Sequence, residues 1–205
     1  SKTYDSSTSL TNYVTIVTGV GTQTLTYTGA TANDANVATT DKYINAITLA
    51  NGSNGGIATN YQLPILNRAN APVTINAKTV TLSAEKTYDG GTSLTGNVTI
   101  TTGVGSETLT YTGATVNNAN VATANKFINA ITLANGSNGG LATNYQLPGL
   151  TTAAAGINTV TIDKATLTVT ADNKARVYGD SNPSLSHTIT GYVNSENATS
   201  AGITG

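Results

Sequence analysis

The chain has 205 residues, of which 38% are apolar and only 9% are charged, and its formal net charge is −1. It contains one histidine and no cysteine, which excludes disulfides, cysteine-bound zinc and thiol catalysis. The small net charge excludes electrostatic binding of nucleic acid or of an anionic membrane surface. Abundant Thr, Asn, Ser and Gly are typical of polar β-structure with tight turns.

A long internal repeat dominates the sequence. Residues 2–64 align without a gap on residues 86–148, and 50 of the 63 pairs, each 84 positions apart, are identical. We therefore predict tandem domains with one fold. They are the first repeat (residues 1–77, lacking its first strand), the second repeat (residues 78–164) and a truncated third segment (residues 165–205). No apolar run reaches the ~20 residues of a membrane helix, so we expect no membrane insertion in this segment. The sequence shows no signal peptide, but it starts inside a repeat, so we expect an excerpt of a longer protein.

The predicted elements follow a period of two rather than 3.6 residues. In the second repeat, alternating apolar and polar residues mark strands at 78–84, 97–101, 107–113, 126–136 and 160–170. Gly, Asn and Pro clusters separate them as turns. The pattern predicts an all-β protein of tandem immunoglobulin-like antiparallel β-sandwich domains in an elongated array. The predicted core comprises Leu10, Val14, Ile16, Leu25, Tyr27, Ile47, Leu49, Tyr61 and Leu63, with the residues 84 positions later.

Three tyrosines, Tyr4, Tyr88 and Tyr178, each end a strand-like segment directly before a turn. We expect each ring to cap one end of a sandwich core while its hydroxyl binds a loop backbone group. Asp5 and Asp89 follow two of these tyrosines and are placed to accept hydrogen bonds from backbone amides of the turn. These residues are predicted to be structural.

Two further tyrosines, Tyr61 and Tyr145, lie in the repeated motif ATNYQLP. They resemble the tyrosine that fixes a corner between sheets in immunoglobulin-like domains. We predict a structural role for these two rings as well.

The motifs KTYDG with TSL, NYQL and ATLTVTA resemble the YDG-type repeat domain. TLTVTADNKARVYGDSNPSL is similar to the start of the related MBG domain of the YG-containing type. Both resemblances imply immunoglobulin-like domains arranged in tandem within large secreted bacterial adhesins of the filamentous-haemagglutinin-like kind. The first repeat departs from the pattern, because Ser6 and Ser7 replace two glycines and predict a less tight turn.

No catalytic, cofactor-binding or metal site is predicted, and no enzyme activity. His187 lies in the unrepeated tail, the glycine-rich segments lack the lysine of a phosphate loop, and acids are too sparse for a calcium loop. One alternative is a covalent bond between Lys2 or Lys42, or their copies, and an Asn or Asp such as Asp5. The simpler interpretation is that the lysines are solvated and the aspartates cap turns.

Three functions remain open. The first is a structural stalk in an extracellular bacterial cell-surface or secreted adhesin, which projects a distal binding region and supports adhesion or biofilm formation. The second is a module that binds an extracellular polysaccharide of a biofilm matrix, for which Tyr13 and Tyr192 are the unpaired aromatic candidates. The third is a filament assembled from copies of the chain. The expected partners are therefore neighbouring repeats, a polysaccharide or other copies, with no nucleic acid.

Overall fold

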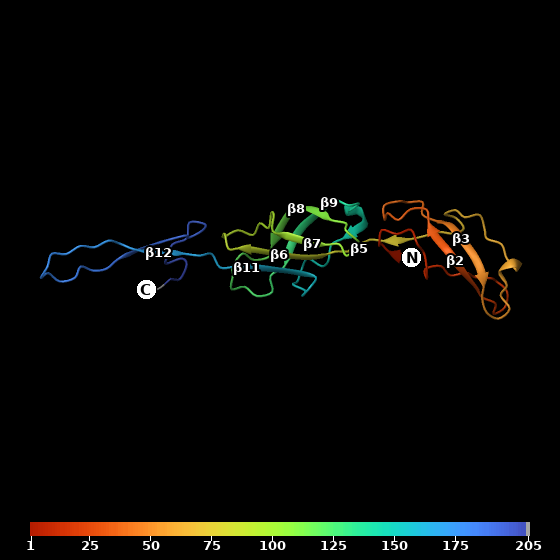
Figure 1. The fold of residues 1–205 in the computed structure, drawn as a ribbon, viewed down its shortest axis with the longest axis horizontal. Helices are drawn as coiled ribbons and strands as arrows, with labels where there is room; N and C mark the ends of the chain where they lie inside the picture. The colour runs from red at the N-terminus through yellow and green to blue at the C-terminus, as the bar shows by residue number, and fades with distance from the viewer. Residues whose placement is uncertain (204–205) are drawn as a thin grey trace. The chain divides into compact units, whose positions relative to one another are not determined.

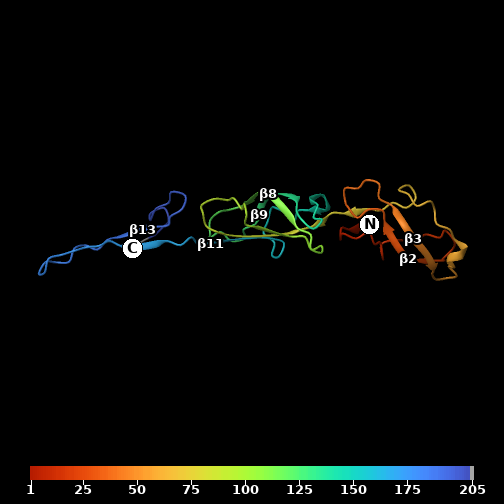
Figure 2. The same cartoon turned by 45° about the horizontal axis from the view of Figure 1, so that its top comes forward.

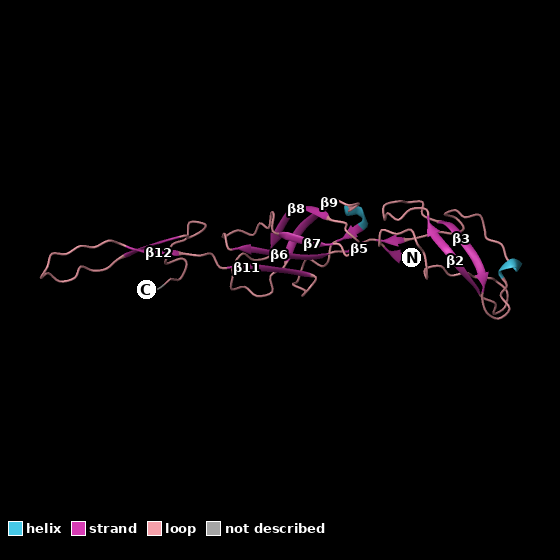
Figure 3. Cartoon of the chain, in the orientation of Figure 1, coloured by secondary structure: helices cyan, strands magenta, loops and turns pink. Residues whose placement is uncertain are grey.

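The protein is nearly all β. A computed structural model describes residues 1–203 and has 34% of the residues in strands and 3% in helix, with no helix of seven or more residues. The helical residues form two short 3-10 turns, η1 (Ala58–Asn60) and η2 (Ala142–Asn144), seen in cyan in Figure 3. The predicted all-β class is confirmed, while the immunoglobulin-like arrangement of the sheets stays a prediction.

The strands are short, and several have only two residues (Figure 1). They are β1 (Lys2–Thr3), β2 (Leu25–Ala32), β3 (Ile44–Asn51), β4 (Ile75–Asn76), β5 (Lys78–Thr79), β6 (Thr81–Thr87), β7 (Val98–Thr101), β8 (Leu109–Val116), β9 (Ile128–Asn135), β10 (Tyr145–Gln146), β11 (Asn158–Asp163), β12 (Thr168–Ala171) and β13 (His187–Thr190). Strands β2 and β3 recur 84 positions later as β8 and β9, as the sequence repeat requires.

Contacts divide the described chain into two compact units. The first contains residues 1–81, 100–111 and 133–148, and the second contains residues 82–99, 112–132 and the chain from 149 onward. The second repeat thus supplies residues to both units.

In the first unit, β2 and β3 form an antiparallel hairpin and lie side by side in Figures 1 and 2. Leu10, Ala30 and Ala32 are buried there. The half-buried side chains that pack on them are Val14, Tyr27, Ile44, Ile47 and Val73. Period-two alternation explains this core, since every second side chain of a strand points to the same face. Leu63, predicted in the core, is 37% exposed.

Three strand pairs run parallel, which corrects the purely antiparallel expectation. β1 pairs with β4, β5 with β10, and β6 with β11. The first and last strands of a repeat therefore run in the same direction. A parallel pair needs a long crossover connection, and here the rest of the repeat supplies it.

In the second unit, β6 supplies Leu82 and Ala84 to a core shared with Val160 and Ile162 of β11, all of them buried. Asn158 is fully buried as well. Its Oδ1 accepts the Ile128 N–H at 2.9 Å, and its Nδ2 donates to the carbonyls of Ile128 at 3.0 Å and Gly149 at 3.1 Å. Such satisfied hydrogen bonds are what a buried amide requires.

The third segment has little core among its described residues. Its strands β12 and β13 form an antiparallel hairpin, yet Val169, Val177 and Leu185 are 63%, 72% and 86% exposed. The prediction for residues 165–205 includes residues 204 and 205, which lie outside the described chain.

Candidate functional site

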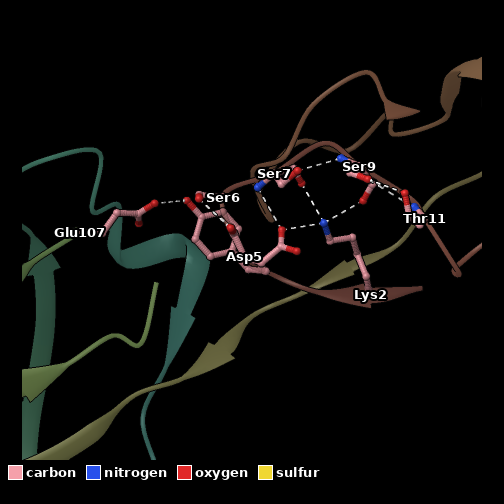
Figure 4. Close-up of polar contacts among 8 residues, drawn as sticks. Lys2, Asp5, Ser6, Ser7, Ser9, Thr11 and Glu107 are labelled. Atoms are coloured by element: carbon pink, nitrogen blue, oxygen red, sulfur yellow. Dashed lines mark hydrogen bonds and ion pairs between the residues drawn. The ribbon is translucent and has the colours of Figure 1, made fainter. Parts of the chain in front are cut away.

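The candidate site begins with a buried lysine at the start of the chain. Lys2 lies on β1 and is 3% exposed, which corrects the expectation of a solvated lysine. Its Nζ donates to the carbonyls of Ser7 at 2.9 Å and Ser9 at 3.0 Å and pairs with Asp5 at 2.6 Å (Figure 4). An ammonium group has three protons, so this loop satisfies all of them and is fixed around the lysine.

The same loop recurs in the second repeat. Lys86 Nζ donates to the carbonyls of Gly91 and Ser93, each at 3.0 Å, and to Asp89 Oδ1 at 2.6 Å. The Lys86 hydrogen bond, followed by the backbone N–H of Gly91, lowers the pKa of Asp89. Asp5 likewise accepts a turn N–H, from Ser7 at 3.0 Å.

The serine substitution in the first repeat leaves this turn unchanged. Ser6 has a φ of 64° and its counterpart Gly90 a φ of 77°. Both residues are therefore left-handed, a conformation that costs a serine more than a glycine. The prediction of a less tight turn is wrong, because the lysine hydrogen bonds hold the same geometry.

A second buried lysine fixes the loop between β2 and β3. Lys42 is 5% exposed, and its Nζ donates to the carbonyls of Val37, at 2.8 Å, and Thr39. Burial lowers the pKa of Lys42. Lys126 repeats the arrangement 84 residues later with Val121, again at 2.8 Å. Each repeat therefore presents two ordered loops, a Tyr–Asp loop (residues 4–9 and 88–93) and an Asn–Val loop (residues 36–39 and 120–123).

Tyr4 does not bind a backbone group, as the sequence suggested, but a side chain of the second repeat. Its hydroxyl donates to Glu107 Oε1 at 2.9 Å (Figure 4), and Tyr145 donates to Oε2 of the same carboxylate at 2.7 Å. The two rings meet edge to face, with centroids 5.5 Å apart and planes at 78°, a favourable aromatic geometry. One carboxylate therefore accepts from a tyrosine of each repeat.

Both tyrosines are deeply buried by this contact. Tyr4 is 4% exposed and Tyr145 is 6% exposed. Burial, followed by the hydrogen bond and the charge of Glu107, raises the pKa of Tyr4 to about 12 and raises that of Tyr145 further. All three effects disfavour a tyrosinate beside a carboxylate, so the contact favours neutral phenols.

A second contact joins the Asn–Val loop to the same end of the second repeat. Asn144 is fully buried, and its Nδ2 donates to Asn36 Oδ1 at 2.9 Å while its Oδ1 accepts the Val37 N–H at 2.9 Å. The side-chain amide thus uses its donor and its acceptor at once. Reciprocal amide pairing of this kind fixes orientation as well as distance.

These contacts define an acceptor face on the second repeat. We use this name for Thr102, Val104, Glu107, Asn144 and Tyr145. A tight turn builds it: Glu107 N–H donates to the Val104 carbonyl at 3.1 Å, and Gly105 has a φ of 45°, a conformation that glycine adopts at low cost. Thr102 Oγ1 donates to the Glu107 carbonyl at 2.9 Å.

Glycines of the unchanged sequence NAITLANGSNGG lie against the backbone next to this turn. A Cβ on Gly136 or Gly140 would lie 2.2 or 1.9 Å from the carbonyl oxygen of Thr108, which follows Glu107. Only glycine fits so close to a backbone. A larger residue at either position would therefore displace the backbone at Thr108, next to the acceptor turn.

The contact recurs between the second repeat and the third segment, within the second unit. Tyr88 donates to Glu196 Oε1 at 2.6 Å, and that hydrogen bond, followed by burial, raises the pKa of Tyr88. Glu196 lies in a turn of the same kind as Glu107, since its N–H donates to the Val193 carbonyl at 3.0 Å. Val121, the counterpart of Val37, lines a cavity of ≈ 480 Å³ with Tyr88 and Glu196.

This third segment has a relative among known families. Residues 167–205 match the MBG domain (YGX type) family. The matched MBG residues include Glu196, which accepts the tyrosine of the preceding repeat. Neither the curated proteins nor the solved structures include a match to the chain.

Of the remaining predicted residues, Tyr13 lies beside Lys2, whose Nζ is 5.9 Å from the ring centroid, and Tyr192 lines the same cavity as Tyr88 and Glu196. Tyr61 donates to Gln23 Oε1, whereas Tyr178 is fully exposed. Of the two candidates for sugar binding, Tyr13 is 50% exposed. Tyr192 is half-buried, and no described residue is a hydrogen-bond partner for its buried hydroxyl.

Residues 1–203 contain no cluster of three or more His, Cys, Asp or Glu side chains that could hold a metal ion. Their helices are too short to cross a membrane.

The sequence did not point to Glu107, Glu196 or Asn144 as functional residues. A signal was present, since Val20, Val104 and Val193 each stand three residues before Gln or Glu, but a hydrogen bond spanning 103 residues leaves no local periodicity.

Proposed function

We propose that this chain is a structural segment of an extracellular adhesin, on a bacterial cell surface or secreted, which holds a distal binding region away from the cell. One observation carries the proposal: the tyrosines Tyr4 and Tyr88 each leave their own repeat and donate to a glutamate of the following one. These side-chain contacts join each repeat to its neighbour, as an array that transmits mechanical load requires. The MBG family match is consistent with an adhesin repeat region.

Two features support a mechanical role over an enzymatic one. Tyr4 and Tyr145, the tyrosines whose pKa is raised most, donate to Glu107, so their hydroxyl groups are occupied. The buried Nζ groups of Lys2 and Lys86 donate to loop oxygens and are therefore occupied as well. The partners in this proposal are the neighbouring repeats of the same polypeptide. Binding of a polysaccharide and assembly of copies into a filament are weaker alternatives, because the repeated aromatics are used at the contacts.

Small-angle scattering of the purified chain tests the proposal. Strands of six to eight residues with turns at both ends give an advance of roughly 35–45 Å per repeat at ~3.3 Å per residue. We expect a radius of gyration well above the ~17 Å of a compact globule of this length. The double variant Tyr4→Ala, Tyr88→Ala should broaden the distance distribution, whereas the control Tyr178→Ala should not. A compact wild-type particle would contradict a stalk.

A glycan-array measurement separates the polysaccharide alternative. We expect no binding by the wild-type chain above the level of a Tyr13→Ala, Tyr192→Ala variant. Binding that these two substitutions abolish would favour the polysaccharide module instead.

A further inference from the structure

The first repeat carries its own copy of the acceptor face. Because the offset is 84, its members are Thr18, Val20, Gln23, Asn60 and Tyr61. These residues and their counterparts in the second repeat belong to the same compact unit. The two faces have nearly the same residues, with Gln23 in place of Glu107 as the one change, so their surroundings are directly comparable.

The two faces differ in what covers them. Val20 is 50% exposed, while Val104 is 5% exposed. Asn60 is exposed, while Asn144 is fully buried and bound to the Asn–Val loop. The difference lies in the docked loops of the first repeat and not in the residues themselves.

The uncovered face is already built. Gln23 N–H donates to the Val20 carbonyl at 3.1 Å, as in the second repeat, and Gly21 has a φ of 49°. Tyr61 donates to the Gln23 side chain as Tyr145 does to Glu107. A site that keeps its bound geometry when it is uncovered loses little conformational entropy on binding.

We propose that this face of the first repeat is a docking surface for the Tyr–Asp loop and the Asn–Val loop of another repeat of this kind, joined in tandem. The matching face of the second repeat supports this proposal, because it already binds both loops. There the ring of Tyr4 is buried beside Glu107, and Asn144 is buried beneath the Asn–Val loop. In this docking, the hydroxyl of the incoming tyrosine donates a hydrogen bond to the side-chain amide of Gln23. The incoming Asn–Val loop forms hydrogen bonds with Asn60. The inference concerns the partner of one face and goes beyond the proposed function, because it does not depend on an adhesin context.

The change of acceptor sets the strength of this docking. A neutral amide forms a weaker hydrogen bond with a phenol than a carboxylate does. The Gln23 face therefore binds an incoming tyrosine less tightly than the Glu107 face binds Tyr4, and Gln23→Glu strengthens it.

A thiol placed on the face tests the proposal, since the chain has no cysteine of its own. Val20→Cys is compared in the 205-residue chain and in a longer chain that carries an added copy of residues 1–84 before Ser1, which restores the 84-residue offset. We expect thiol labelling to slow about tenfold or more in the longer chain, to the rate of a Val104→Cys control. Tyr4→Ala in the added copy should restore fast labelling.

A second longer chain covers the case in which the first fails to fold, which a reactive Val104→Cys would reveal. It carries an added copy of residues 85–171, whose last residue aligns with Ala84. Slow labelling of Val20→Cys in a folded longer chain supports the proposal, and equally fast labelling in both longer chains overturns it. Labelling of the 205-residue chain that slows as its concentration rises would assign the face to a second copy and overturn the tandem assignment.

Discussion

Replacing Tyr4 by phenylalanine keeps the buried ring and removes only the hydroxyl that donates to Glu107. A hydrogen bond to a charged group contributes about 1.5–3 kcal/mol to stability. Glu107 is half-buried and keeps the hydroxyl of Tyr145, so the lower end applies and we expect a loss of about 1–2 kcal/mol. Tyr4→Ala also removes a ring that is 4% exposed, and we expect it to cost about 3–5 kcal/mol.

The assay is a double-mutant cycle of Tyr4→Phe with Glu107→Gln, measured by urea unfolding with far-ultraviolet circular dichroism. With a slope of about 1–3 kcal/mol per molar urea, the single loss should lower the midpoint by roughly 0.3–2 M. The coupling energy should be about 1 kcal/mol. Tyr178→Phe is the matched control, since that ring is fully exposed.

A coupling energy below about 0.3 kcal/mol, within the additivity of distant sites, would refute this reasoning. It would mean that Tyr4 and Glu107 do not interact in solution.

Three further outcomes follow from the same geometry. Because the folded pKa of Tyr4 is raised to about 12, its stabilisation is complete below pH 10 and is lost as the pH rises toward 12; urea midpoints from pH 8 to 12 should fall more for wild type than for Tyr4→Phe, and equal slopes would contradict the burial argument. Lys86→Met leaves two loop carbonyls without their donor and should cost about 2–4 kcal/mol, against under 0.5 kcal/mol for the exposed Lys164→Met; equal thermal stability of the two variants would count against a buried ammonium. The pKa of Asp89 is lowered, so its small contribution is present above its ordinary pKa and is lost as the pH falls through the lowered value; Asp89→Asn should remove that part of the acid dependence in a pH titration of the melting temperature, and an unchanged acid limb would argue against the Lys86 contact.

The β class followed from the sequence because period-two alternation is local. In β2 and β8, Leu and Tyr alternate with Thr, and burial follows the alternation. The parallel pairing of β6 with β11 did not follow from the sequence, because nothing in either strand encodes the direction of a partner about 75 residues away.

Only about half of the candidate site could be predicted from the sequence. The Tyr–Asp turns were visible as repeated motifs, and Asp5 and Asp89 accept the turn amides that such motifs favour. The burial of Lys2 and Lys86 was not visible, because a lysine before a turn is usually solvated. Here the carbonyls that bind the ammonium belong to a loop whose path depends on the fold.

The most direct test of the account is the distance between two rings in solution. The centroids of Tyr4 and Tyr145 lie 5.5 Å apart across successive repeats. Nuclear Overhauser measurements on a chain with labelled tyrosines should therefore give cross-peaks between these two rings, and Glu107→Ala should weaken them. Two rings without cross-peaks, with Tyr4 open to a soluble paramagnetic probe to the same degree as Tyr178, would contradict the account.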